Sequence, residues 1–485
     1  MRPSQFNLRV PLAAQGDEFL MNTLTDAQLI VSSDVAALLD RAAAGTLSGA
    51  AWSTTEELEA LDVLTDNGFL VEDHAADQRA LDDYLADVKS DATELNVTLL
   101  TTLQCNFACD YCFQGDHGDY NKFADKMSLA TAERTIAWME RELDRVHPEL
   151  LLLTFFGGEP LLNLPVMYLI AERMWEATQA RGVEMGVNII TNGLLLTSDV
   201  VDRMLPFGLN AVKITLDGDR DAHNRMRPLR GGQGTFDRIV HNIGQVAGRC
   251  RIAIGGNFDE SSVDSYPALL EFLKAQEFAD KLVKVNFKPI FRAEPVGAAT
   301  SVPTGGDGGS RAGRRLIPLT PVGSSAKSLN GSCFTAAGAG GGTACDSCGV
   351  LDDKMTFLRQ ETKRYGFPTH DGVHNGPCHV HKQHAHTIGP DGSLYPCPGF
   401  TGQLALSTGH IDDRHDSWRE SARERFLRLS PWKECGDCAF IPVCAGGCVA
   451  ASYSQLGDMN TPTCHKPSME SAVISLAHDA ASAVA

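Results

Sequence analysis

Three cysteines stand close together in Thr101-Thr-Leu-Gln-Cys105-Asn-Phe-Ala-Cys109-Asp-Tyr-Cys112-Phe113, directly after the apolar run Leu95-Asn-Val-Thr-Leu-Leu100. A strand that ends in such a tight loop can direct three thiolates at one point. Three thiolates suit three irons of a cubic 4Fe-4S cluster, and the fourth iron is then left for another ligand. A zinc site is the alternative, but it normally closes with a fourth Cys or His at short range. The nearest later candidate, His117, lies in a polar loop that contains glycine.

The spacing of Cys105, Cys109 and Cys112 resembles the signature of the radical S-adenosylmethionine (radical SAM) enzymes. The resemblance implies a 4Fe-4S cluster whose open iron chelates the amino and carboxylate groups of SAM. It also implies that Tyr111, in the same loop, contacts SAM. One electron from the cluster then cleaves SAM to a 5′-deoxyadenosyl radical.

Composition limits the class of protein. The chain has 485 residues, 43% of them hydrophobic, so it can bury more than one core and is expected to form two or three domains. A formal net charge of −19 argues against a nucleic acid partner, because phosphate binding needs clustered Lys and Arg. No apolar run is long enough for a membrane span and no secretory region is seen, so we expect a cytoplasmic protein with no membrane partner. In that compartment the 14 cysteines are better explained as metal ligands than as disulfides.

The N-terminal region combines short strands with helical patterns. Strands are predicted at 6–11, 18–23 and 29–31, and helices at 35–39 and 56–64. This small α+β module resembles the winged-helix element that recognises leader peptides in several radical SAM peptide maturases. The alternative is a plain extension packed on the next domain. A charged helix at about 76–93 links the module to the cysteine loop, and the first domain is placed at residues 1–90.

Beyond the loop, apolar strands alternate with helical patterns. Strands are predicted at 150–156, 186–190, 211–216, 251–254 and 283–287, and the strand before the cysteines makes six. Such alternation is typical of a parallel sheet covered by helices. We therefore predict an α/β fold, a partial (β/α)6 TIM-type barrel over residues 91–293, with its active site at the C-terminal ends of the strands.

The rest of the chain divides by composition. Residues 294–350 are rich in Gly, Ala, Ser and Thr and hold too few apolar residues for a core, so they are predicted to be a flexible insertion. Residues 351–485 then form a Cys-rich C-terminal domain.

Polar residues follow three of the predicted strands. In Phe156-Gly157-Gly158-Glu159-Pro160, the glycines allow close approach to a ligand and the carboxylate can accept an ammonium. In the radical SAM family a segment of this form binds the amino group of SAM. The next two strands end in polar groups that can hydrogen-bond the ribose and methionyl parts of SAM. These residues are Thr191, Asn192, Thr215 and Asp217.

The resemblance continues after Asp217. The runs Asp217-Gly218, His223-Asn224-Arg225-Met226-Arg227 and Gly232-Gln-Gly-Thr-Phe236 resemble the family's Asp-Gly, His-Asp-x-x-Arg and Gly-x-x-Thr-Phe runs, with Asn224 where Asp is usual. The resemblance implies that Arg227 pairs with the SAM carboxylate. A surface salt bridge is the alternative.

Seven further cysteines lie near the C-terminus: Cys378, Cys397, Cys435, Cys438, Cys444, Cys448 and Cys464. A zinc ribbon would use two pairs and leave three thiols idle. The spacing resembles the SPASM domain, which carries two auxiliary 4Fe-4S clusters in related enzymes. Carried over by position, the first cluster uses Cys378, Cys397 and Cys448, and the second uses Cys435, Cys438, Cys444 and Cys464. The cofactors implied are three 4Fe-4S clusters and SAM.

Other Cys and His residues are left open. The first auxiliary cluster is one ligand short, so either Cys333, Cys345 or Cys348 completes it or one iron is open to substrate. Cys250, beside a predicted strand, is expected in the core. A structural role is favoured over metal binding for His379, His381, His384 and His386.

The resemblance implies an enzyme that modifies a ribosomally made peptide by hydrogen abstraction, forming a thioether or a carbon-carbon crosslink such as a cyclophane. Its implied partners are the precursor peptide, with its leader on the N-terminal module, and a reductase such as flavodoxin or ferredoxin. One alternative is an anaerobic sulfatase maturase, which oxidises Cys or Ser; there an Asp acts as base after the cysteine corresponding to Cys397, whereas Pro398 stands here. A non-catalytic iron-sulfur electron carrier is the second alternative.

Overall fold

A computed structural model describes residues 1–12, 16–47, 55–112, 124–290, 346–369, 373, 376–413 and 416–484, with only the backbone described at 346–352, 416–421, 455 and 484. The glycine-rich segment therefore lies outside the described residues except for 346–350, which begin a helix, and Cys333 and Cys345 lie outside as well. In the described part, no helix is long and apolar enough to cross a membrane.

The central feature is a parallel sheet of six strands in sequence order. They are β6 (Glu94–Thr102), β7 (Leu150–Gly157), β8 (Glu184–Thr191), β9 (Leu209–Thr215), β10 (Arg251–Phe258) and β11 (Leu282–Pro289). Each pairs in parallel with the next. The six predicted strands are confirmed, with ends that differ by at most four residues. The predicted fold class, an α/β fold with a partial (β/α)6 TIM-type barrel, is also confirmed.

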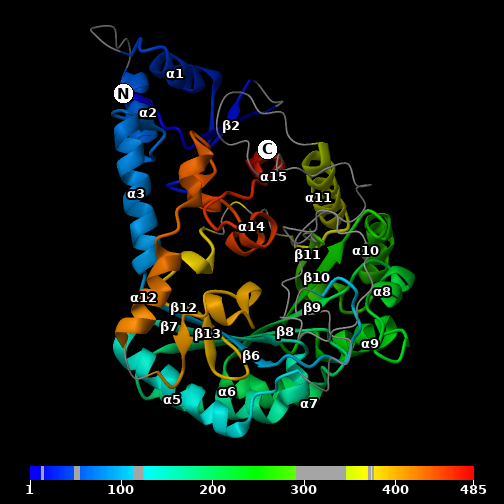
Figure 1. The fold of residues 1–485 in the computed structure, drawn as a ribbon. Coiled ribbons are helices and arrows are strands. Elements are labelled where there is room, and N and C mark those ends of the chain that lie inside the picture. Colours follow the sequence, from blue (N-terminus) through cyan, green and yellow to red (C-terminus); the bar gives the residue numbers. More distant parts are fainter. Residues whose placement is uncertain are drawn as a thin grey trace, which may run out of the picture.

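Helices cover the outer face of this sheet, as Figure 1 shows for the cyan and green elements. They are α5 (Leu129–Val146), α6 (Leu164–Gln179), α7 (Ser198–Met204), α8 (Arg220–Met226), α9 (Phe236–Val246) and α10 (Tyr266–Lys274). Burial alternates along β7, because every second side chain faces the helices. Leu153 of β7 and Ile170 of α6 share one fully buried core. The other face of the sheet carries polar residues such as Thr154, Asn188 and Lys213.

The C-terminal part extends the sheet, which the sequence did not reveal. Strand β12 (Ala385–Ile388) pairs in parallel with β6, and β13 (Ser393–Tyr395) and β14 (Gly409–His410) continue the sheet antiparallel. The further C-terminal helices are α11 (Asp346–Arg364), α12 (Asp416–Leu427), α13 (Ile441–Cys444), α14 (Val449–Leu456) and α15 (Lys466–Val484).

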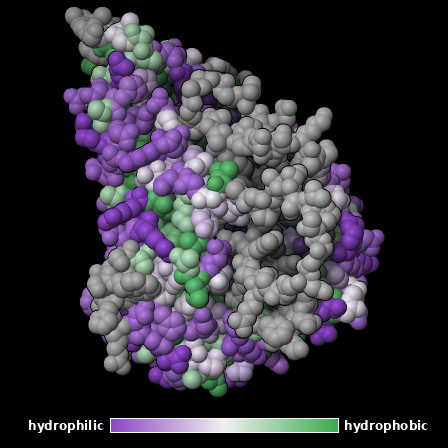
Figure 2. Space-filling view, viewed as in Figure 1, coloured by the Kyte–Doolittle hydropathy of each residue, from purple (hydrophilic) through white to green (hydrophobic). Residues whose placement is uncertain are grey.

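The N-terminal module is built as predicted, from a small antiparallel sheet and helices. Its sheet has the order β2 (Asn7–Pro11), β3 (Glu18–Asn22), β4 (Gln28–Val31), and its helices are α1 (Ser33–Ala43) and α2 (Thr55–Asp66). Strands β1 (Arg2–Pro3) and β5 (Leu70–Val71) pair with each other. The linking helix α3 (His74–Ser90) ends three residues before the predicted position and carries a mainly hydrophilic surface (Figure 2).

The module packs on the C-terminal elements. Phe19 and Met21 of β3 share a core with Phe440 and with Val473 of α15. Phe6 shares another with Trp432 of the C-terminal part. In Figure 1 the orange and red elements accordingly lie between the blue module and the cyan and green sheet. The module is therefore no simple extension on the barrel, as the alternative interpretation of the sequence had it.

Candidate cofactor site

The cysteine loop is anchored where β6 ends. Phe107 is buried in the barrel core, and the backbone N–H of Ala108 donates to the carbonyl of Pro228 at 2.9 Å. Arg230 donates from its backbone N–H to the carbonyl of Asn106 and from Nε to that of Cys105, at 3.1 and 2.9 Å. The segment after α8 thus holds the loop that carries Cys105, Cys109 and Cys112.

Gly157 and Gly158 are needed by this loop. A Cβ built on Gly157, whose φ is +131°, would lie 2.3 Å from the carbonyl oxygen of Thr102. A Cβ on Gly158 would lie 2.2 Å from that of Gln104. The backbone N–H of Gly158 and of Glu159 donate to these two carbonyls, at 2.9 and 2.8 Å. In the structure, the glycine pair brings the backbone after β7 against the cysteine loop, so its close approach is to protein.

Glu159 ties the ends of β7 and β8 together. Its carboxylate is fully buried: Oε1 accepts from Thr191 Oγ1 at 2.7 Å and from the N–H of Leu161 at 3.0 Å, and Oε2 accepts from the N–H of Asn192 at 2.8 Å. Burial raises the pKa of Glu159, and these three donors lower it in part. The Asn192 side chain in turn donates to Asn106 Oδ1 at 2.7 Å and lies 3.9 Å from Cys105 Sγ.

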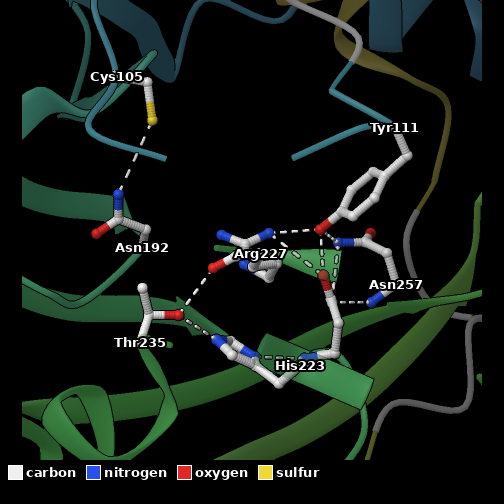
Figure 3. A network of polar contacts seen from close by, with 8 residues as sticks. Cys105, Tyr111, Asn192, His223, Arg227, Thr235 and Asn257 are labelled. Carbon is white, nitrogen blue, oxygen red and sulfur yellow. Dashed lines mark hydrogen bonds and ion pairs between the residues drawn. The ribbon is translucent and has the colours of Figure 1, made fainter. Parts of the chain in front are cut away.

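A second group forms around the buried residues Asp217 and Arg227, with Tyr111 and Asn257 beside them; Tyr111, Arg227 and Asn257 are labelled in Figure 3. Asp217 Oδ1 accepts from the backbone N–H of Asn257 at 2.6 Å. Its Oδ2 accepts from the Tyr111 hydroxyl and lies 3.3 Å from Arg227 Nη1, which also donates to the Tyr111 oxygen. Burial raises the pKa of Asp217 against the opposing effect of Arg227. Arg227 Nε is buried and has no hydrogen-bond partner among the described residues.

His223 fixes the position of this group through its two ring nitrogens. Its Nδ1 accepts from the backbone N–H of Asp217 at 3.1 Å, and its Nε2 lies 3.0 Å from Thr235 Oγ1, which donates to the carbonyl of Arg227 at 2.8 Å. The hydroxyl proton is thus used, so Nε2 carries the hydrogen and donates. Burial lowers the pKa of His223 well below its usual value, which keeps the ring neutral. Asn224, at the position of the family's Asp, accepts from the N–H groups of Thr235 and Phe236 and fixes the same turn.

The sequence did not point to Asn106 or Asn257 as site residues, and it placed His223 in a family-like run without assigning it a role. A usable signal for Asn257 existed, because it follows Gly255-Gly256 near the end of β10. Thr215, the last residue of β9, lies opposite Gly255 in the parallel register. The structure therefore brings the predicted SAM contacts Tyr111, Asp217 and Arg227 together, and it joins Glu159 to Thr191 and Asn192.

Three lysines line the inner face of the sheet beside this site. Lys213 of β9 and Lys284 of β11 are both in register with Ala253 of β10, and Lys288 is in register with Asn257. The Lys213 chain crosses Gly255, where an added Cβ would lie 2.7 Å from its Cε. The pKa of Lys213 is lowered to about 8, mainly by desolvation and also by the positive charges of Lys288 and Lys284.

Ten of the described cysteines fall into three groups by the thiols that act on one another. In the first, burial raises the pKa of Cys105 to about 12 and of Cys109 to about 11, and nearby thiols including Cys112 add to both shifts. In the second, burial raises the pKa of Cys397 and of Cys378, and Cys448 adds to both shifts. In the third, burial raises the pKa of Cys435, Cys438 and Cys444, and Cys464 adds to each shift.

These groups have the membership that the resemblance implied for three clusters. In the described part, no three His, Cys, Asp or Glu residues converge as they would on a single metal ion. Three or four thiols around a larger body suit a cubic cluster, because each binds a different iron. The donor sets fit iron-sulfur clusters in chemistry and grouping, while ligation by these cysteines stays a prediction. Cys250 packs against the barrel core, apart from the three groups.

Comparison with known proteins identifies a domain within the chain. Residues 99–251 match the model of the "Radical SAM superfamily", and this segment holds the cysteine loop and Arg227. The chain therefore contains a radical SAM domain over these residues.

The curated relatives carry the names of enzymes with different activities. A GTP 3′,8-cyclase of Synechococcus sp. (strain CC9605) is 30% identical over 34% of this chain and 44% of its own length. An AdoMet-dependent heme synthase of Methanosarcina barkeri (strain Fusaro / DSM 804) is 24% identical over 74% of this chain and 91% of its own. The chain spans less than half the length of the first curated relatives that it matches.

Among solved structures, native anSMEcpe with bound AdoMet has a TM-score of 0.55 at 15% identity, and the likeness covers 80% of this chain and 99% of that one. The same protein with AdoMet and the Cp18Cys peptide gives a TM-score of 0.53 at 16% identity, over 81% and 100%. At such identities the likeness shows a shared fold.

Proposed function

We propose that this protein cleaves SAM reductively and uses the product to abstract hydrogen from a ribosomally made peptide. The observation that carries the proposal is the arrangement at the ends of the parallel strands. There the cysteine loop lies next to the buried pair Asp217–Arg227, while two further thiol groups occupy the C-terminal part. A reduced 4Fe-4S cluster at the loop would supply the electron that cleaves SAM.

The chain's own residues would bind and orient SAM. Arg227 is the group proposed for the carboxylate, because its Nε is buried and meets no hydrogen-bond partner in the described part of the chain, and its Nη1 is fixed by Asp217 and Tyr111. Thr215 and the strand ends at Glu159, Thr191 and Asn192 are proposed for the ribose and amino groups. With its oxygens already accepting three hydrogen bonds, Glu159 has one remaining lone pair on Oε2 for an ammonium.

A peptide substrate is supported by the N-terminal module. In the order β2-β3-β4, strand β4 pairs on one side with β3 and forms an edge of the described sheet. Such an edge can take up an extended peptide through main-chain hydrogen bonds. The fold neighbour with AdoMet and a peptide bound shows that a similar fold accommodates both. We place the leader on this module and the modified segment at the barrel mouth, with a flavodoxin or ferredoxin as the electron source.

Anaerobic reconstitution with iron and sulfide, followed by dithionite and SAM, tests the activity. We expect 5′-deoxyadenosine. Replacing Cys105, Cys109 and Cys112 with Ala together should abolish this product and keep about two thirds of the iron, because the other groups have separate ligands. Cys250→Ala is the control, since that thiol lies outside the groups.

The outcomes separate the alternatives. If the wild type binds iron but forms no 5′-deoxyadenosine, the proposal of an enzyme is refuted. The electron-carrier alternative is then favoured. Oxidation of a single Cys or Ser in the peptide would favour the sulfatase-maturase reaction over crosslinking. Mass spectrometry of the peptide that a neighbouring reading frame encodes distinguishes the two, because a crosslink removes two hydrogens and leaves no aldehyde.

A further inference from the structure

Arg423 is a buried cation in the C-terminal part. It lies on α12 with 6% of its surface exposed, and α12 packs on the segment His379–His381 that follows Cys378. Its Nη2 donates to the carbonyl oxygen of His379 at 3.4 Å and to that of Lys382. These contacts fix one end of the guanidinium against the backbone next to Cys378.

The other donors of the guanidinium are unused. Nε and Nη1 are buried and have no hydrogen-bond partner among the described residues, and no carboxylate of those residues forms an ion pair with Arg423. A buried charged group without partners is costly, commonly several kcal/mol, so proteins rarely keep one unless something binds it.

The ionisable groups near Arg423 are thiols and the histidines His379, His381 and His384. Burial lowers its pKa to about 10, and the opposing effects come from Cys397 and Cys378. In return, Arg423 is among the groups that lower the pKa of Cys378. It has no such effect among the causes for Cys435, Cys438 or Cys444. Of the two C-terminal thiol groups, Arg423 therefore acts on the first.

We infer that the Nε–H and Nη1–H groups of Arg423 donate hydrogen bonds to sulfur atoms of the first auxiliary cluster. These hydrogen bonds and the positive charge would raise the reduction potential of that cluster. The inference rests on the proposed function, because it requires that Cys378, Cys397 and Cys448 hold a cluster. Hydrogen bonds to the sulfurs and net charge set the potential of such clusters. A fixed cation with two donors stabilises the reduced form, which carries one more negative charge, more than the oxidised form. Arg423 is thus a positioning residue for the cluster and touches no substrate.

The test is an anaerobic redox titration of the reconstituted full chain, followed by electron paramagnetic resonance, with iron content measured on each sample. The variants are Arg423→Lys, which keeps the charge and loses the planar fork, and Arg423→Gln, which loses the charge. The control is Arg425→Gln on the same helix: Arg425 is exposed, and its Nη2 donates to the carbonyls of Ala405 and Ser407, away from the thiols. The SAM-binding cluster is recognised because its signal changes when SAM is added.

We expect Arg423→Gln to lower the midpoint of one auxiliary signal, Arg423→Lys to lower it less, and Arg425→Gln to leave all midpoints unchanged. If Arg423→Gln loses one cluster, its iron content falls by about a third. The reduction potential is then compared between the wild type and Arg423→Lys. Unchanged midpoints with full iron in both Arg423 variants would overturn the inference. A wild type that binds only about four irons would refute the auxiliary clusters of the proposed function, before any variant is made.

Discussion

At the scale of single residues, Gly158 determines how closely the cysteine loop can approach β7. Gly158→Ala would place a Cβ at 2.2 Å from the carbonyl of Gln104, and this backbone atom cannot move aside without shifting the loop. We expect a loss of about 1–3 kcal/mol in unfolding free energy, as for other overpacked sites, and loss of 5′-deoxyadenosine formation. Thermal unfolding and product analysis measure the two effects.

Gly244→Ala is the matched control for Gly158. Gly244 lies inside α9, and an added Cβ would meet Phe278 Cδ1 at 3.5 Å, an ordinary contact. Alanine is favoured over glycine in a helix, so this variant should gain about 0.5–1 kcal/mol and keep its activity. Equal behaviour of the two variants would contradict the role given to Gly158.

Lys213 provides a pH-dependent prediction. With its pKa lowered to about 8 in the folded state, the unfolded chain binds more protons above pH 8 and up to the usual lysine value of about 10.4. The contribution of Lys213 to the unfolding free energy therefore rises between about pH 8 and 10.4. Below pH 8 the buried charge of Lys213 destabilises the folded protein to its full extent. Lys213→Met should stabilise the protein at pH 7, with an advantage that vanishes above about pH 10.4. Denaturant titrations from pH 6 to 11 measure it, and a constant difference would contradict the prediction.

At the scale of elements, the edge strand β4 is the part of the module that a leader peptide would meet. The backbone N–H of Asn22 donates to the carbonyl of Ala27, and hydrogen-bonded pairs alternate along antiparallel strands. Gln28, opposite Met21, is next in register and directs its N–H away from β3. It is exposed and begins the strand, where proline is tolerated.

Gln28→Pro should therefore weaken leader binding without unfolding the module. Loss of one main-chain hydrogen bond costs about 1 kcal/mol, or roughly fivefold in Kd. Fluorescence anisotropy with the labelled precursor peptide measures the affinity, and Gln28→Ala is the control because it keeps the N–H. If proline and alanine bind equally well, the peptide does not add to this edge.

At the scale of the whole molecule, the N-terminal module and the C-terminal part share hydrophobic cores. Phe440→Ala should cost about 3–5 kcal/mol and accelerate amide hydrogen exchange in β3, because Phe440 packs on Phe19 and Met21. Phe258→Ala, in the separate barrel core, is the control of similar size. Exchange in β3 that responds equally to both variants would show that the two cores are not separable.

The sequence was sufficient for the barrel because its strands are apolar and alternate with helical patterns, and because polar residues follow three of them. It was not sufficient for β12, whose four residues Ala385–Ile388 include a histidine and form a strand by pairing with β6 on one side and with β13 on the other. The residue types of the site were also readable. Which oxygen of Glu159 accepts from which donor depends on the meeting of the segments that follow β7 and β8, and the local sequence pattern carries no information on that.

The pairing of β6 with β12 also affects how the chain is made. Asn96 lies opposite Ala385, so one neighbour of β6 emerges from the ribosome long after the other strands of the barrel. During translation β6 is an edge strand with an apolar sequence, which is the type of segment that pairs wrongly between chains. Contacts so distant in sequence also slow folding. We therefore expect slower synthesis or lower temperature during expression to increase the yield of soluble protein more than added iron does.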